Sequence, residues 1–203
     1  MKNLWNERFD REDYLFGTEP ALFLQKRADL LAASTGKTAL AIADGEGRNS
    51  VFMARHGVQV TAMDSSDVGL KKARKLAADN DVSIDFQLAD LRKWDWGAQQ
   101  YDLVVAIFIQ FADPTFRSEI FEGMKQALKP GGTILLHGYT PKQIEYGTGG
   151  PGVLENLYTE DMLRDAFGDI SITELSAYDA EIQEGPGHSG ISALIDLVAT
   201  KPV

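Results

Sequence analysis

The chain of 203 residues contains no cysteine. This absence excludes a disulfide, a thiolate metal site and a cysteine nucleophile, and we expect no bound metal. Long apolar runs are also missing, since none approaches the ~20 residues that a transmembrane helix needs. The opening residues, MKNLWNERFDRED, lack the apolar core of a signal peptide. The sequence therefore predicts no contact with a membrane and a cytoplasmic location.

Basic residues are scarce relative to acidic ones. There are 20 Lys and Arg against 30 Asp and Glu, which gives a net charge of −10 and a pI of about 4.7. Nucleic acid would be repelled, because phosphate contacts dominate affinity for it. We therefore expect a small-molecule substrate and no nucleic acid. The length and a hydrophobic content of 44% are typical of a single globular domain over 1–203. The oligomeric state does not follow from the sequence.

Residues 39–66 form the segment around which the chain is organised. A short apolar run at 39–43 predicts a buried strand, and the glycine turn 44–47 follows it. The pattern then predicts a helix over 48–56 and a strand over 58–63 that ends on Asp64. This order of elements is typical of nucleoside binding at the carboxyl edge of a parallel sheet. Asp64 lies nineteen positions after the first glycine, where a carboxylate accepts both ribose hydroxyls.

The charge of the glycine turn indicates which nucleoside binds. A dinucleotide site needs a third glycine where this chain has Ser50. Asp44 and Glu46 flank Gly45, and their carboxylates would repel a pyrophosphate but attract a sulfonium and an ammonium. These observations favour S-adenosylmethionine over NAD. An NAD-dependent oxidoreductase and a non-catalytic S-adenosylmethionine-binding module are the alternatives.

Four segments carry a resemblance to a known family: ADGEGRNS, MDSSDVGLKKA, LKPGGTILL and the opening WNERFDREDYLFGTEP. They resemble class I S-adenosylmethionine-dependent methyltransferases of the tellurite-resistance (TehB-like) type, over nearly the whole chain. The resemblance implies a Rossmann-like α/β fold with a seven-stranded, mostly parallel sheet, an antiparallel last strand and helices on both faces. It also implies that the N-terminal arm, residues 1–18, closes over the cofactor as a lid through residues 5–18. The alternative is an arm whose aromatic residues only cover the core.

The chain departs from this family at two positions. An acid is usual at the position of Ala41 and a glycine at that of Ala43. Without the acid, Asp44 or Glu46 would hold the methionine ammonium.

The resemblance and the predicted topology together define a cofactor site. Its expected members are Tyr14, Gly17, Ala43, Asp44, Gly45, Glu46, Gly47, Asn49, Asp64, Ser65, Asp90, Leu91 and Ile107. Asp64 is expected to hold the ribose, and the two glycines to admit the methionine moiety. The resemblance implies that Asp90 takes the adenine amino group and that the backbone of Leu91 contacts the ring. From the residues alone, Asp90 would be a helix cap or turn residue.

The rest of the chain predicts alternating helices and strands. Helices are expected from Glu19-Pro20 towards Gly36 and over 67–79, 115–128 and 159–167, and strands over 84–88, 101–107, 133–139, 170–178 and 192–201. Asp67 is the expected cap of the helix 67–79. Long loops are expected at 140–157 and 179–190. The nearly continuous apolar run 193–199 predicts a strand inserted into the middle of the sheet.

Acceptor binding is expected beyond the carboxyl ends of the later strands, where ligands meet a parallel sheet. The expected substrate residues are Phe108, Gln110, Tyr139 and Tyr146. His188 lies in a glycine-rich loop on this face and is the candidate catalytic base. The alternative is that it satisfies a backbone group. A soft acceptor, such as a thiol or a chalcogen oxyanion, is favoured, and the segment after 101–107 lacks the Asn/Asp-Pro-Pro-aromatic motif of many amino-group methyltransferases.

The other two histidines are expected to be structural. His56 in the last turn of a helix suits the helix dipole, and His137 inside a strand is expected to be a satisfied core residue.

Overall fold

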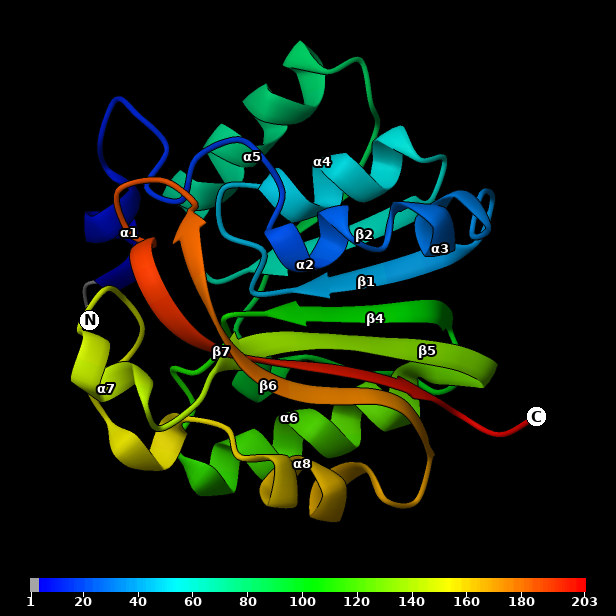
Figure 1. Cartoon of the computed structure of the whole chain (residues 1–203). Helices are drawn as coiled ribbons and strands as arrows, with labels where there is room; N and C mark the ends of the chain where they lie inside the picture. Colours follow the sequence, from blue (N-terminus) through cyan, green and yellow to red (C-terminus); the bar gives the residue numbers. More distant parts are fainter. Residues whose placement is uncertain (1–3) are drawn as a thin grey trace. The chain divides into compact units, whose positions relative to one another are not determined.

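The computed structural model describes residues 4–203. Its seven strands form one mixed sheet in the order β3-β2-β1-β4-β5-β7-β6, accompanied by helices (Figure 1). β7 is antiparallel to β5 and β6, whereas the pairs β1–β2, β2–β3 and β4–β5 are parallel. The Rossmann-like fold predicted from the sequence, with its antiparallel last strand, is confirmed.

The chain divides into two compact units. Unit 1 comprises Met1–Trp94 with Glu184–Gly187, and unit 2 comprises Asp95–Gln183 with His188–Val203. Residues 1–3 of the expected arm lie outside the described residues. The single domain expected over 1–203 remains a prediction. Among residues 4–203, none of the helices has both the length and the apolar character needed to cross a bilayer.

Unit 1 contains a parallel three-stranded part of the sheet with α4 and α5 packed against β2. Its elements are α1 (Leu4–Phe9), α2 (Leu22–Gln25), α3 (Ala28–Ala32), β1 (Thr38–Ile42), α4 (Arg48–Arg55), β2 (Gln59–Asp64), α5 (Asp67–Asp79), β3 (Asp85–Leu88) and the 3₁₀ helix η1 (Leu91–Lys93). Gly57, just after α4, has a φ of +80° and ends the helix as predicted.

Two expectations for unit 1 are corrected. The single helix expected from Glu19-Pro20 is two short helices, because Arg27, with φ −114° and ψ 24°, interrupts the helical backbone between α2 and α3. The cap of α5 is Ser66, whose hydroxyl accepts the Gly69 N–H, and not Asp67. Both serine and aspartate are good caps, so residue type alone did not separate the two neighbours.

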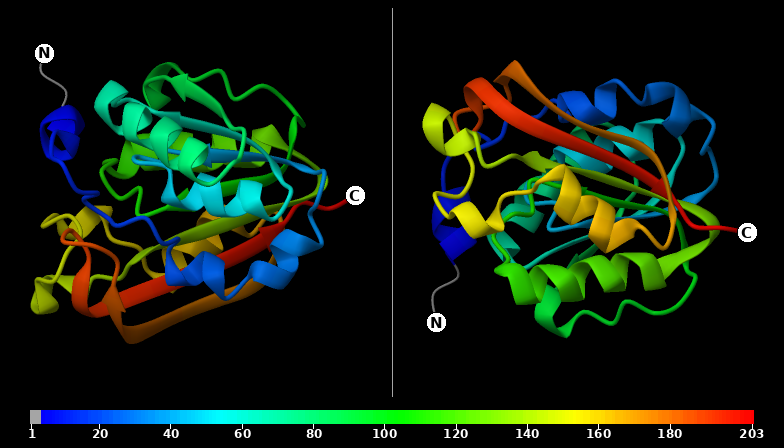
Figure 2. Two further views of the ribbon diagram at one scale, coloured as in Figure 1. Left: turned by 90° about the horizontal axis from the view of Figure 1, so that it is seen from above. Right: turned by 60° about the horizontal axis from the view of Figure 1, so that its bottom comes forward.

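Unit 2 contains the other four strands of the sheet, β4, β5, β7 and β6, together with the helices that pack against them. Its elements are β4 (Tyr101–Ile107), α6 (Pro114–Ala127), β5 (Leu128–Tyr139), α7 (Gln143–Tyr146), the 3₁₀ helix η2 (Leu154–Asn156), α8 (Glu160–Phe167), β6 (Ser171–Gln183) and β7 (Ser189–Thr200). α6 packs on β4 and β5, α8 packs on β6 and β7, and the two helices lie side by side (Figure 2).

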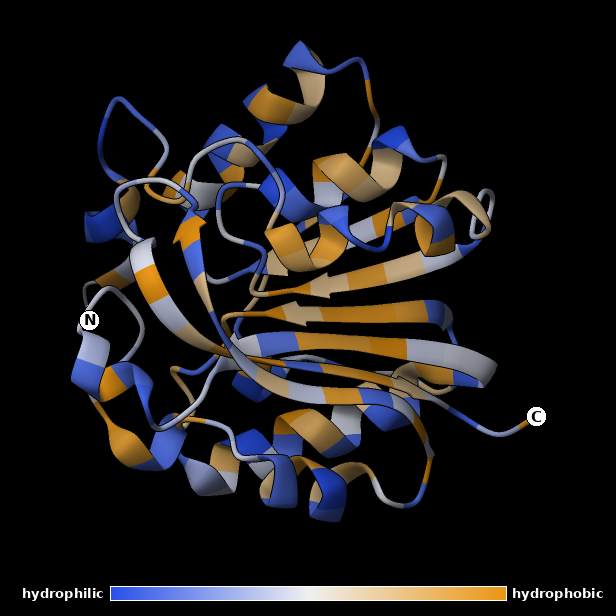
Figure 3. Cartoon of the chain, in the orientation of Figure 1, coloured by the Kyte–Doolittle hydropathy of each residue, from blue (hydrophilic) through white to orange (hydrophobic). Residues whose placement is uncertain are grey.

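Hydrophobic residues concentrate in the central strands of unit 2 (Figure 3). Residues 103–106 of β4 are buried, as are residues 193–199 of β7. β7 pairs with β5 on one side and β6 on the other. The inserted strand predicted from the apolar run is confirmed.

The predicted bounds of the loop 179–190 are wrong, because the loop is shorter. Pairing of β6 with β7 continues to Gln183 and Ser189, so only residues 184–188 lie outside the strands. Most residues of β6 are exposed or half-buried, and such an edge strand carries a weak hydrophobic pattern. β5 also begins at Leu128 rather than 133, and α7 and η2 lie within the loop expected at 140–157.

Candidate functional site

The glycine turn after β1 has a backbone that only small residues can adopt. Gly45 and Gly47 have φ values of +64° and +91°. A Cβ on Gly47 would lie 2.7 Å from the Cβ of Ala73, so no larger residue fits there. Ala43 has a φ of +48°, in the left-handed region that glycine adopts without strain. The turn therefore brings its backbone close to neighbouring groups, as a turn that binds a nucleoside must.

Asp64 is buried at the end of β2 and its carboxylate spans the glycine turn. Its Oδ2 accepts the Gly45 N–H at 2.9 Å, and its Oδ1 accepts the Ser66 N–H at 2.7 Å. Burial raises its pKa despite these hydrogen bonds. The structure thus fixes this carboxylate beside the turn, where the sequence predicted the ribose ligand.

Asp44 is the second carboxylate of the turn. Its Oδ2 accepts the Ser50 hydroxyl at 2.5 Å. Burial is the main cause that raises the pKa of Asp44 to about 7, and the neighbouring Asp64 raises it further. A bound cation would favour the ionised form of this group. The position therefore suits a positively charged ligand.

Glu46, in contrast, is occupied by the arm and by a lysine. Its Oε2 accepts the backbone N–H groups of Leu15 at 2.8 Å and Phe16 at 3.4 Å, and its Oε1 lies 2.5 Å from Lys72 Nζ. Of the two acids that the sequence offered for a ligand ammonium, Asp44 is therefore the better candidate.

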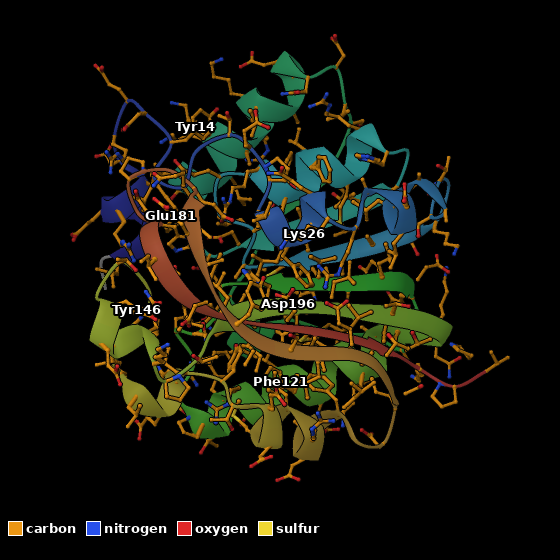
Figure 4. The ribbon with its side chains drawn as sticks, viewed as in Figure 1. Tyr14, Lys26, Phe121, Tyr146, Glu181 and Asp196 are labelled. Carbon is orange, nitrogen blue, oxygen red and sulfur yellow. The ribbon has the colours of Figure 1, made fainter. Side chains whose placement is uncertain are left out.

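Aromatic residues of the arm pack on the glycine turn. Phe9 is buried, and a Cβ on Gly45 would lie 3.2 Å from its ring. The Trp5 ring stacks on Phe9 with centroids 5.5 Å apart. The Tyr14 hydroxyl donates to the Lys72 carbonyl at 3.2 Å (Figure 4). The arm of unit 1 thus lies directly on the predicted cofactor turn.

A buried ion pair holds the arm from the other side. Arg48 donates to Glu184 Oε2 at 2.7 Å and to the Phe16 carbonyl at 3.1 Å. The other carboxylate oxygen of Glu184 accepts the Leu22 N–H at 3.0 Å. Both charged side chains are buried, with 6% and 8% of their side-chain surfaces exposed. We name Arg48, Glu184 and Glu46 the arm clamp.

The sequence patterns did not predict the arm clamp. Arg48 follows the glycine turn directly, which is a signal for function. Its partner Glu184, however, is 136 positions away, and no local pattern predicts that pairing. The expected cofactor residue Gly17 lies beside the same segment, since a Cβ on it would be 3.6 Å from the Gly185 nitrogen.

Four other expected cofactor residues lie in unit 1 and differ in burial and contacts. The side-chain oxygen Oδ1 of Asn49 accepts the Ala21 N–H at 3.0 Å and secures the chain after the arm. Asp90 is exposed and its Oδ1 accepts the Arg92 N–H at 3.0 Å, which is the cap expected from the residues alone. Leu91 is buried, and Ser65 is exposed. Their roles towards adenine and ribose remain predictions.

In unit 2, three rings surround Phe108 immediately after β4. The ring centroid of Phe108 lies 4.7 Å from His137, 4.7 Å from Tyr139 and 4.3 Å from His188. Phe108 has a φ of +55°, which is strained for a bulky residue. We name these four residues the aromatic cluster. Ile107 is the last residue of β4 and is half-buried.

The remaining expected acceptor residues differ in their surroundings. The Gln110 amide exchanges two hydrogen bonds with the Tyr139 backbone, at 2.8 and 2.7 Å, so it supports Tyr139, and its contact with the substrate remains a prediction. The Tyr146 hydroxyl donates to Asp179 at 2.8 Å. His188 is the last residue of the loop 184–188, but its side chain is buried, with the residue 6% exposed, and packs in the aromatic cluster.

His137 is satisfied in the core, as predicted. Its Nδ1 lies 2.6 Å from Asp196 Oδ1 on β7. The Tyr178 hydroxyl donates to the same carboxylate at 3.2 and 3.3 Å. Unit 2 therefore contains a buried His–Asp pair beside the aromatic cluster.

Comparison with known proteins gives the geometry its chemical context. Residues 39–132 match the model of a family described as a methyltransferase domain. A ribosomal protein L11 methyltransferase of Campylobacter concisus is 29% identical over 147 residues, which are 70% of this chain and 44% of that protein. The chain thus spans less than half the length of this curated relative.

Solved structures share the fold. An enzyme of echinomycin biosynthesis, described as converting a disulfide bond into a thioacetal group, has a TM-score of 0.78 at 14% identity and covers 97% of this chain and 88% of its own. TehB from Haemophilus influenzae has a TM-score of 0.70 at 17% identity, with 87% and 62% covered. The N-methyltransferase NodS from Bradyrhizobium japonicum, in complex with S-adenosylhomocysteine, has a TM-score of 0.71 at 15% identity, with 98% and 97% covered. Residues 39–132 therefore resemble a methyltransferase domain, and these solved structures share the fold of the chain.

Proposed function

We propose that this chain transfers a methyl group from S-adenosylmethionine to a small acceptor. The observation that carries the proposal is the glycine turn of unit 1 with its two carboxylates, the half-buried Asp44 and the buried Asp64. One carboxylate suits the ribose hydroxyls and the other suits the cationic methionine moiety. An NAD site would instead place a pyrophosphate beside these acids. The carboxylates would repel the pyrophosphate, which argues against NAD as the cofactor.

The residues present fit this cofactor. Asp64 accepts the ribose hydroxyls with Ser65 beside it, and Asp44 faces the ammonium. Gly45 and Gly47 admit the methionine moiety because neither has a side chain. Asp90 and Leu91 frame the adenine, and Tyr14, Gly17, Ala43 and Asn49 complete the part of the site in unit 1. When bound, S-adenosylmethionine supplies a methyl group on a sulfonium, whose positive charge disappears during transfer.

The arm acts as the lid over this site. Glu46 and Lys72 hold the backbone of the arm, and Phe9 covers the glycine turn. A lid excludes water and completes the site when it closes. We place residues 5–18 in this role.

The acceptor is a soft nucleophile bound at the aromatic cluster, with Tyr146 as a further contact. Strain at Phe108 and the clustering of His188 with Tyr139 support this placement. The similar structures include an enzyme of disulfide chemistry and TehB, which favours sulfur or another chalcogen and the tellurite-resistance type. Aromatic walls and polarisable chalcogens suit one another.

Turnover across a panel of acceptors tests the function. The purified chain is incubated with S-adenosylmethionine and thiols, chalcogen oxyanions, amines or carboxylates, and S-adenosylhomocysteine is measured. We expect rates well above the acceptor-free reaction for thiols or chalcogen oxyanions. S-adenosylmethionine binding without turnover on any acceptor would instead indicate a non-catalytic module, and NAD binding an oxidoreductase.

A further inference from the structure

We propose that His137 takes a proton from the acceptor and that Asp196 holds its imidazole in the tautomer that this needs. The inference rests on the proposed methyl transfer and narrows the acceptor to molecules with an ionisable S–H or O–H group. The two residues face each other across neighbouring strands, since His137 on β5 pairs in register with Asp196 on β7.

The pair is fixed and buried. Nδ1 of His137 lies 2.6 Å from Asp196 Oδ1, and the side chains are 2% and 6% exposed. The Tyr178 hydroxyl donates to both oxygens of Asp196, at 3.2 and 3.3 Å, which orients the carboxylate. A carboxylate at Nδ1 places the proton there, and the lone pair is then on Nε2. This is the tautomer of a base that accepts a proton at Nε2.

Packing alone gives no reason for this pair. Asp196 is the one charged residue within the apolar run 193–199 of β7. Burying two ionisable groups carries a desolvation cost, and replacing such a pair by apolar residues is often neutral or stabilising. A polar pair at this position is therefore better explained by chemistry than by stability.

The location of the pair connects it with the acceptor. The ring of Phe108 lies against the His137 imidazole, with centroids 4.7 Å apart. Phe108 is half-buried, so its ring can contact both the His137 imidazole and a bound acceptor. An acceptor against that ring would lie beside His137, away from bulk water.

The proton and electron balance is complete. The acceptor sulfur or oxygen forms a bond to the methyl carbon, and the bond from that carbon to the sulfonium sulfur breaks with its electron pair on the sulfur. The acceptor proton passes to His137 Nε2, where Asp196 stabilises the imidazolium until the proton returns to solvent. Asp196 is a positioning residue in this step.

Two acceptors separate a base from a structural histidine. In His137→Gln, we expect kcat/KM for a thiol to fall ~10²–10⁴-fold, while a thioether, which has no proton to lose, keeps its rate. His56→Gln, at the end of α4, is the matched control with unchanged rates.

A measurement independent of turnover gives the second readout. Nitrogen-15 NMR of the histidine side chains, with S-adenosylmethionine bound, should show His137 with its proton on Nδ1, and Asp196→Asn should change that tautomer. Equal losses with thiol and thioether, or a proton on Nε2 in wild type, would overturn the proposal. A wild-type enzyme that methylates the thioether but no thiol or hydroxyl would also overturn it, without affecting methyl transfer itself. No turnover on any acceptor would overturn both.

Discussion

Replacing Arg48 by methionine is expected to lower the free energy of unfolding by about 3–5 kcal/mol, the cost of leaving one charge of a buried pair without its partner. The partner is Glu184, whose carboxylate also accepts the Leu22 N–H. Loss of the guanidinium removes the hydrogen bond to the Phe16 carbonyl as well, so the arm should loosen. Urea unfolding measures the first effect, and trypsin cleavage within residues 5–18 measures the second.

A double variant and a surface pair serve as controls for the arm clamp. Arg48→Met combined with Glu184→Leu should recover much of the lost stability, because no unpaired charge remains. Lys75→Met breaks the exposed pair with Asp79 on α5 and should cost no more than about 1 kcal/mol. If Arg48→Met is no more destabilising than Lys75→Met and the arm stays protected, the clamp does not hold the arm.

Affinity for S-adenosylmethionine is expected to fall as pH drops below about 7, approaching tenfold for each pH unit. Below this pH we expect Asp44 of the free protein to carry a proton, because burial raises its pKa to about 7. A cationic ligand favours the ionised carboxylate and lowers its pKa. Binding at lower pH must therefore release this proton, while above pH 7 the affinity should reach a plateau. Calorimetry at pH 6 in buffers of different ionisation enthalpy should show release of close to one proton.

Asp44→Asn separates this carboxylate from its neighbour. The variant should bind more weakly at pH 7.5 and should lose most of the pH dependence. Burial raises the pKa of Asp64 too, so this group is the alternative source of a released proton. An unchanged slope in Asp44→Asn would remove Asp44 from the cation site.

Local patterns predicted the part of the molecule that depends on neighbours in sequence. The strand, glycine turn, helix and acid of residues 39–64 are found as predicted, because a buried strand and a left-handed glycine leave clear local signals. The inserted strand β7 was predicted from its apolar run. The extent of β6 was not, because an edge strand with exposed side chains has little hydrophobic pattern.

Long-range polar contacts could not be predicted from the sequence. Both Asp44 and Glu46 suited a ligand cation on charge alone, and only the structure shows Glu46 bound to the arm backbone and Lys72. The pairing of His137 with Asp196 spans 59 positions and depends on β7 lying beside β5. The sequence identified His137 as a core residue but gave no partner for it.

Calorimetric titration of S-adenosylmethionine into wild type and Asp64→Ala tests the central claim most directly. Asp64 is fixed across the glycine turn and is the proposed ribose ligand. Its loss should weaken binding by about 1.5–3 kcal/mol, the scale of a hydrogen bond to a charged group. Asp85→Ala, which removes an exposed carboxylate on the neighbouring strand β3, should bind like wild type. Unchanged affinity in a folded Asp64→Ala protein would contradict the proposed cofactor site.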